Sequence, residues 1–134
     1  MVENYIHSDL TGDIIKCFYT VYNKLGYGFL EKVYEKSLRI ELEAAGFKVE
    51  CQKPIDVYYN EELVGEYFAD IIVEDSVIIE LKASRELQES HSVQLINYLK
   101  ATDIEVGLLF NFGEIPKVKR RIFTNTRKQH IQIK

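Results

Sequence analysis

The chain has 134 residues, of which 46% are hydrophobic and 28% are charged. This length suits one domain with a single core, and the hydrophobic content argues against intrinsic disorder. No run of about 18 apolar residues is present, and residues 1–10 lack the features of a signal peptide, so we expect a cytoplasmic protein without a membrane partner. Cys17 and Cys51 have no CxxC spacing, which gives no support to a zinc site or a disulfide framework.

The formal net charge of −4 hides an uneven distribution. Residues 117–134 carry seven basic side chains and no acidic one, whereas the first 116 residues carry ten basic and 21 acidic side chains. We therefore expect an acidic body and a basic C-terminal tail. Two interpretations of the tail remain open: it neutralises phosphates of a nucleic acid, or it is a solvated segment that offsets the acidic body.

Two helices are predicted in the first third of the chain. Apolar residues recur at helical spacing over 9–26 and again over 30–46, and each segment ends at a glycine. Residues 47–59 then have the β-branched and aromatic content of a strand, and Pro54 predicts either an edge strand or a bulge. Asn60 and Glu61 follow as a hairpin turn.

The second half alternates strands with one helix. The pattern predicts strands over 67–75, 76–83 and 105–113, a helix over 87–101, and over 118–124 either an outer strand or the start of the basic tail. The helix is long enough to make the strands before and after it parallel neighbours. The expected fold is a single α/β domain in which helices flank a mixed sheet of three antiparallel strands plus a parallel strand.

The most informative feature is a pair of acids on the predicted hairpin of residues 67–83. If the turn is centred on Asp75, Val73 lies opposite Val77, and Asp70 lies opposite Glu80. Opposed residues point to the same side of a sheet, with Cβ atoms about 4.5–5.5 Å apart. An unpaired acid inside an apolar strand is costly, so two such acids require something positive between them.

A divalent cation held by oxygen ligands is the simplest such partner. Asp70 and Glu80, with the Leu81 carbonyl as a third ligand, could hold one Mg²⁺ or Mn²⁺, which would activate a water and polarise a phosphate. Lys82 lies on the same side and could orient that water or contact the phosphate. The alternative is that Glu80 and Lys82 form an exposed charged stripe and that Asp70 caps a turn.

Polar side chains on two helices extend this group. Gln94 and Tyr98 are four residues apart and share one helix face, which His91 continues toward the N-terminus. Glu31 and Tyr34 share a face of the second helix, where Glu31 supplies a third carboxylate. Both tyrosines have a simpler interpretation as packed helix residues that each find one hydrogen-bond partner.

The segment 28-GFLEKVY-34 matches the signature of the GxxExxY protein family. The match continues through 52–59, 65–75, 79–83, 94–102 and 107–113, and so covers residues 9 to 123. The chain thus resembles a compact branch of the PD-(D/E)XK nuclease superfamily, whose members hydrolyse phosphodiesters with Mg²⁺ or a similar ion. This resemblance implies a restriction-endonuclease-like core.

The resemblance also implies a set of catalytic residues: Asp70, Glu80, Lys82, Glu31, Gln94 and Tyr98. Asp70 and Glu80 match the two motif acids, and Glu31 matches the helical glutamate, which would join the metal site through a metal-bound water or help to position a second ion. Gln94 and Tyr98 resemble the Gln-x-x-x-Tyr motif of RecB-like exonucleases. Ala69 stands where many members have proline, a departure common in the superfamily.

The sequence therefore predicts a metal-dependent nuclease that acts on DNA or RNA. The alternative is a non-catalytic module that keeps the fold and binds nucleic acid or a protein, with its basic tail and with tyrosines such as Tyr19, Tyr58 and Tyr59. A purely structural subunit is a third interpretation. Because the chain is short, a homodimer would be one way to enlarge its contact with a duplex.

Overall fold

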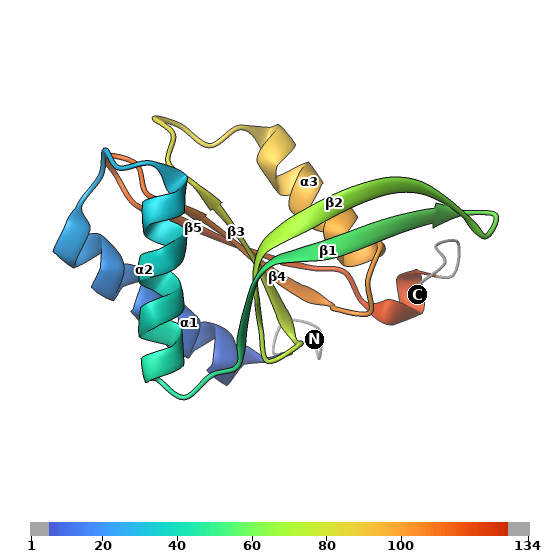
Figure 1. The fold of residues 1–134 in the computed structure, drawn as a ribbon, viewed down its shortest axis with the longest axis horizontal. Helices are drawn as coiled ribbons and strands as arrows, with labels where there is room; N and C mark the ends of the chain where they lie inside the picture. Colours follow the sequence, from blue (N-terminus) through green and yellow to red (C-terminus); the bar gives the residue numbers. More distant parts are fainter. Residues whose placement is uncertain (1–5, 129–134) are drawn as a thin grey trace.

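The computed structural model describes residues 6–128. Within them the elements are, in chain order, α1 (Ser8–Leu25), α2 (Glu31–Ala44), β1 (Val49–Tyr59), β2 (Glu62–Val73), β3 (Val77–Lys82), α3 (Glu89–Lys100), β4 (Val106–Asn111), β5 (Lys117–Ile122) and a 3₁₀ turn (Asn125–Arg127). Figure 1 shows their arrangement. The predicted helices and strands are confirmed, with ends that differ by a few residues.

The strands form one mixed sheet in the order β1-β2-β3-β4-β5. β3 and β4 are parallel and are connected by α3, whereas the other neighbouring pairs are antiparallel. The parallel crossover predicted from the helix length is therefore confirmed. Residues 117–122 form the outer strand β5, so the first of the two interpretations for 118–124 is correct. Residues 129–134 of the predicted basic tail lie outside the described residues.

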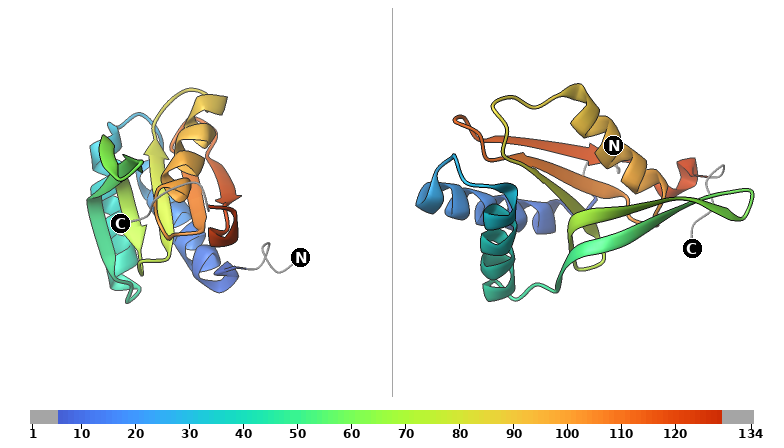
Figure 2. Two further views of the ribbon diagram at one scale, coloured as in Figure 1. Left: turned by 90° about the vertical axis from the view of Figure 1, so that its right-hand side faces the viewer. Right: turned by 45° about the horizontal axis from the view of Figure 1, so that its top comes forward.

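Helices cover both faces of the sheet (Figures 1 and 2). α1 and α2 pack on one face, where Phe18 stacks on Phe110 with ring centroids 4.4 Å apart. α3 packs on the other face, where Leu95 and Leu99 contact Ile78 and its neighbours. Because side chains alternate between the faces of a strand, the central strands β3 and β4 carry apolar residues at almost every position. None of the helices in residues 6–128 is long and apolar enough to cross a bilayer.

The β2–β3 turn has the register that the sequence predicts. Val73 pairs with Val77 and Ile71 with Ile79, around a turn in which Glu74 and Asp75 both have positive φ angles of 53° and 52°. Main-chain pairing between the two strands ends at Ile71. Beyond that point β2 leaves the sheet together with β1.

These departing residues of β1 and β2, from 53 to 69, form a two-stranded arm that extends beyond the helices (Figure 1). Cys51 and Ile71 contact the α1–α2 core, yet Ile55 and Ala69 contact the α3 core. Residues an even number of positions apart should share a face, so both strands change face in between. The change occurs at Gln52, which has a φ of 53°, and at Asp70 opposite it.

Candidate functional site

Asp70 and Glu80 lie where β2 and β3 separate. The Asp70 N–H donates to Glu80 Oε2 over 3.0 Å, and the Leu81 N–H donates to Asp70 Oδ2 over 2.8 Å. Each carboxylate thus satisfies an N–H group that the sheet would otherwise have paired. The crossed hydrogen bonds hold the two side chains on the same side of the hairpin, as the sequence predicts.

Burial makes both carboxylates difficult to ionise. Glu80 is only 4% exposed, and burial, followed by the negative charge of Asp70, raises its pKa to about 8. Burial also raises the pKa of Asp70, against the hydrogen bonds from Leu81 and Gln52 that lower it. Within residues 6–128 no Lys or Arg forms an ion pair with either carboxylate. The interpretation of Glu80 as part of an exposed stripe is therefore wrong.

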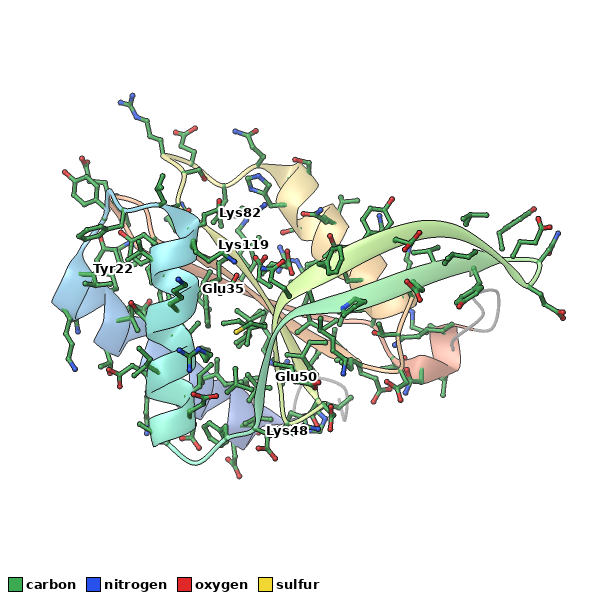
Figure 3. All side chains as sticks on the ribbon, in the orientation of Figure 1. Tyr22, Glu35, Lys48, Glu50, Lys82 and Lys119 are labelled. Atoms are coloured by element: carbon green, nitrogen blue, oxygen red, sulfur yellow. The ribbon has the colours of Figure 1, made fainter. Side chains whose placement is uncertain are left out.

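Lys82 is half-buried and is the last residue of β3; Figure 3 labels its side chain. Its charge favours ionisation of both carboxyls, since it lowers the pKa of Asp70 and of Glu80. Burial, together with the charge of Lys82, lowers the pKa of His91 on the first turn of α3. The side chain of His91 accepts a hydrogen bond from the Gln88 N–H, so it caps its helix.

Two further residues reach the acids, and the sequence reasoning missed both. Gln52 Nε2 donates to Asp70 Oδ1 over 3.3 Å and to Glu35 Oε1 over 2.7 Å. Glu35 is 7% exposed on the side of α2 that faces the sheet, and its other oxygen accepts from Lys32 Nζ. One signal was available: Glu35 lies one helical turn after Glu31. The 60–61 turn by itself would place Gln52 opposite Ala69, and only the register shift between Val57 and Tyr58 brings it opposite Asp70.

The predicted residues of α2 have separate roles in the structure. Glu31 is the exposed first residue of the helix, and its charge contributes to the raised pKa of Glu80. Tyr34 is fully buried; its hydroxyl donates to the Gly26 carbonyl and accepts from the Phe29 N–H. The packed interpretation of Tyr34 is confirmed. Gly28, with a φ of 107°, allows the tight turn that Tyr34 closes.

Gln94 and Tyr98 share a face of α3, as predicted. Gln94 Nε2 donates to the Tyr98 hydroxyl over 3.0 Å, and Tyr98 is 5% exposed. Burial, followed by the charges of Glu80 and Asp70, raises the pKa of Tyr98 to about 12. Tyr98 is therefore a packed residue whose hydroxyl lies close enough to Glu80 and Asp70 for their charges to raise its pKa.

The acid pair suits a divalent cation, although its ligand set is small. No three His, Cys, Asp or Glu side chains among residues 6–128 converge closely enough to hold a metal. Asp70 and Glu80 nevertheless supply hard oxygen donors, and neither carboxylate is in an ion pair within the part of the chain that the structure describes. Leu81 directs its N–H toward Asp70, and a strand residue directs its carbonyl to the same side. Water would complete the ligand shell.

A row of cations crosses the same face of the sheet. Glu80 pairs with Leu109, which pairs with Lys119 on β5, so the three side chains point to the α3 side. Lys82 pairs with Asn111 on β4, which pairs with Lys117 on β5, so Lys82 and Lys117 also point to the α3 side. Lys117 and Lys119 are exposed, and Figure 3 marks Lys119. Part of the predicted basic tail is thus an ordered basic edge beside the acids.

Comparisons with known proteins bear on the fold and the family. A family model for the PD-(D/E)XK nuclease superfamily matches residues 8–123. A solved structure, described as the crystal structure of SSO0001, has a TM-score of 0.50 and 19% sequence identity to this chain. That match covers 69% of this chain and 50% of the other, and at this identity it is evidence for the fold alone. No match was found among curated proteins. On the strength of the family match over nearly its whole length, the chain belongs to the PD-(D/E)XK nuclease superfamily.

Proposed function

We propose that this protein is a metal-dependent nuclease of the GxxExxY branch, which hydrolyses phosphodiester bonds in DNA or RNA. The observation that carries the proposal is the pair formed by the half-buried Asp70 and the buried Glu80, which crossed hydrogen bonds hold together. A structural role alone gives no reason to bury two carboxylates together, because their mutual repulsion and desolvation both cost stability.

The ligands for Mg²⁺ or Mn²⁺ would be Asp70, Glu80 and the Leu81 carbonyl, with Glu31 acting through water. When bound, the ion would neutralise charge on the scissile phosphate and activate the attacking water. Asp70 and Glu80 would both be ionised in that state, because a nearby positive charge lowers a carboxyl pKa. The hydrogen bonds to the Asp70 and Leu81 N–H groups fix the direction of the donor oxygens.

The remaining residues would position the reacting groups. Lys82 would contact the phosphate or orient the water with its ammonium group. Gln52 is a positioning residue, because its amide bridges Asp70 to the buried Glu35 and restricts the rotation of the Asp70 side chain. Gln94 and Tyr98 form a hydrogen-bonded pair that would orient Lys82 and a phosphate oxygen.

The charge of β5 supports a nucleic acid as the substrate. Lys117 and Lys119 lie on the same face of the sheet as Glu80, and with Arg85 they line a cavity of about 800 Å³. Glu86 and Glu114 also line this cavity, so its lining carries three cations against two acids. Lysine and arginine side chains that follow a groove can neutralise successive phosphates, which makes binding dependent on salt. A bound strand would thus pass from β5 toward Lys82.

Cleavage assays with the purified protein test this function. Labelled DNA and RNA should be cut when Mg²⁺ or Mn²⁺ is present and left intact in chelator. Asp70→Asn and Glu80→Gln should each abolish cutting, because they keep the shape and remove the charge. Asp75→Asn is the matched control, since this exposed carboxylate lies on the same hairpin. Equal cutting by the wild type, Asp70→Asn and Glu80→Gln would refute the proposal.

The second candidate is a binding module that has kept the fold. It is favoured by one observation: the described residues contain no group of three metal-ligating side chains. Such a module would bind nucleic acid with a steep salt dependence, without turnover and without a metal requirement. A homodimer, which would enlarge the footprint of either candidate, is tested by sedimentation of the same preparation.

A further inference from the structure

We propose that the groove between the β1–β2 arm and α3 binds an unpaired nucleobase, so that the substrate is single-stranded or carries a single-stranded end. The inference rests on the proposed function, because it assigns the substrate class of the same site. It is carried by three features: the size and lining of the groove, the absence of acids in that lining, and its border with the proposed catalytic site at Gln94 and Tyr98.

The groove has the size and surface of a base-binding site. Its volume is about 450 Å³, within the range of roughly 300–1,000 Å³ typical of small-molecule pockets. Val57, Val64 and Tyr67 form the wall on the arm, and Val93 lies on the α3 wall. Tyr67 is 47% exposed, and Val93 is 52% exposed. An aromatic ring opposite an aliphatic side chain can enclose a flat heterocycle.

The charge of the groove suits an anionic polymer. The chain has 21 acidic residues, yet none lines the groove, whereas Lys100 does. Alternation along the arm explains this: Asp56 and Glu66 pair with each other on the face opposite Val57 and Tyr67. The amides of Gln94 and Asn97 also line the groove and can hydrogen-bond to base edges.

The groove borders the proposed catalytic site, because Gln94 and Tyr98 belong to both. Tyr98 lines it and forms a tilted ring contact with Tyr67, with centroids 5.8 Å apart. Tyr67 precedes Asp70 by three residues on β2, so a base held against Tyr67 belongs to a nucleotide near the scissile phosphate. An unpaired base can lie against Tyr67 while its phosphate lies near Asp70. The bases of a duplex are stacked inside the helix and show only their edges, so they cannot reach the ring in this way.

Binding measurements separate the two proposals. We would measure fluorescence anisotropy of a labelled oligothymidylate, an oligouridylate and a blunt duplex, with Ca²⁺ in place of Mg²⁺. Wild type should bind the single strands more tightly than the duplex. Loss of one stacking partner should weaken single-strand binding by about 5- to 150-fold in Tyr67→Ala. Tyr67→Phe should keep most of the affinity, because the ring remains.

Phe68→Ala is the matched control. Phe68 is the next residue of β2, is 54% exposed, and points to the opposite face of the arm. It should leave single-strand binding and cleavage unchanged. Circular dichroism of each variant checks that the arm is folded.

The outcomes distinguish the inference from the function. The inference would be overturned if Tyr67→Ala and Phe68→Ala had equal effects, or if the blunt duplex bound more tightly than either single strand. The proposed function would still stand in that case, provided that cleavage required Asp70 and Glu80. Conversely, single-strand binding that depends on Tyr67 without any cleavage would support the groove and count against the nuclease. The comparison of oligothymidylate with oligouridylate shows whether the site accepts deoxyribose or ribose.

Discussion

The raised pKa of Glu80 makes the stability of the metal-free protein depend on pH. The carboxyl has a reference pKa of 4.5 and a pKa of about 8 in the folded chain, because it is buried next to Asp70. A carboxyl whose folded pKa lies above its unfolded value contributes stability that is fully present below pH 4.5. That contribution is lost progressively as the pH rises toward 8. The protein without metal should therefore be more stable at mildly acidic than at alkaline pH.

The magnitude follows from the difference between the two pKa values. At 1.36 kcal/mol for each pKa unit, this difference corresponds to about 5 kcal/mol of stability. Because Glu80 and Asp70 titrate as a coupled pair, the part that belongs to Glu80 is about 3–5 kcal/mol. For a domain of this size that is a fall in Tm of roughly 10–20 °C between pH 5 and pH 8.5. Lys128 acts in the opposite direction, because burial lowers its pKa to about 8, so its contribution grows above that pH.

Thermal unfolding in the presence of a chelator, followed by circular dichroism from pH 5 to 9, measures this effect. Glu80→Gln should flatten the dependence, because glutamine still accepts the hydrogen bond from Asp70 but has no charge. The contributions of Lys128 and of all distant groups cancel in the difference between wild type and variant. Parallel curves for the two proteins would refute the assignment of a raised pKa to Glu80.

Three further predictions follow from the site and its support. Added Mg²⁺ should raise the Tm of the wild type at pH 8 by mass action and leave that of Asp70→Asn unchanged; an equal rise in both would place the binding elsewhere. Tyr34→Phe should lower the free energy of unfolding in urea by about 1–2 kcal/mol, because the Gly26 carbonyl loses its partner, and no change would contradict this role. Gly107→Ala should cost about 1–3 kcal/mol in the same assay, since the new Cβ would lie 2.6 Å from Leu95 Cδ1; an unchanged midpoint would mean that Leu95 moves aside freely.

Much of the site follows from patterns that are local in the chain. The spacing of the apolar residues predicted the three helices, and β-branched, aromatic or continuous apolar runs predicted β1 to β4. Residues 118–124, which form β5, were left open between an outer strand and the start of the tail. A turn centred on Asp75 sets the register of β2 and β3 as far as Ile71 and Ile79, and this register directs Asp70 toward Glu80, where crossed hydrogen bonds join them. Lys82 lies two residues after Glu80 on the same strand, and because side chains alternate, it shares a face of the sheet with Glu80. These inferences needed no knowledge of how the elements pack.

Other features depended on tertiary structure. Local alternation could not show that β1 and β2 change face at Gln52 and Asp70, because the change arises where the two strands leave β3. The hydrogen bonds between Glu35 and Gln52, and from Gln52 to Asp70, join α2, β1 and β2, which only packing brings together. The shift in the pKa of Glu80 likewise depends on burial and on the charges of residues from several elements, such as Asp70 on β2 and Glu31 on α2. Sequence determined which oxygens face each other, whereas the packing of the sheet and helices decided how deeply they are buried and which residues hold them.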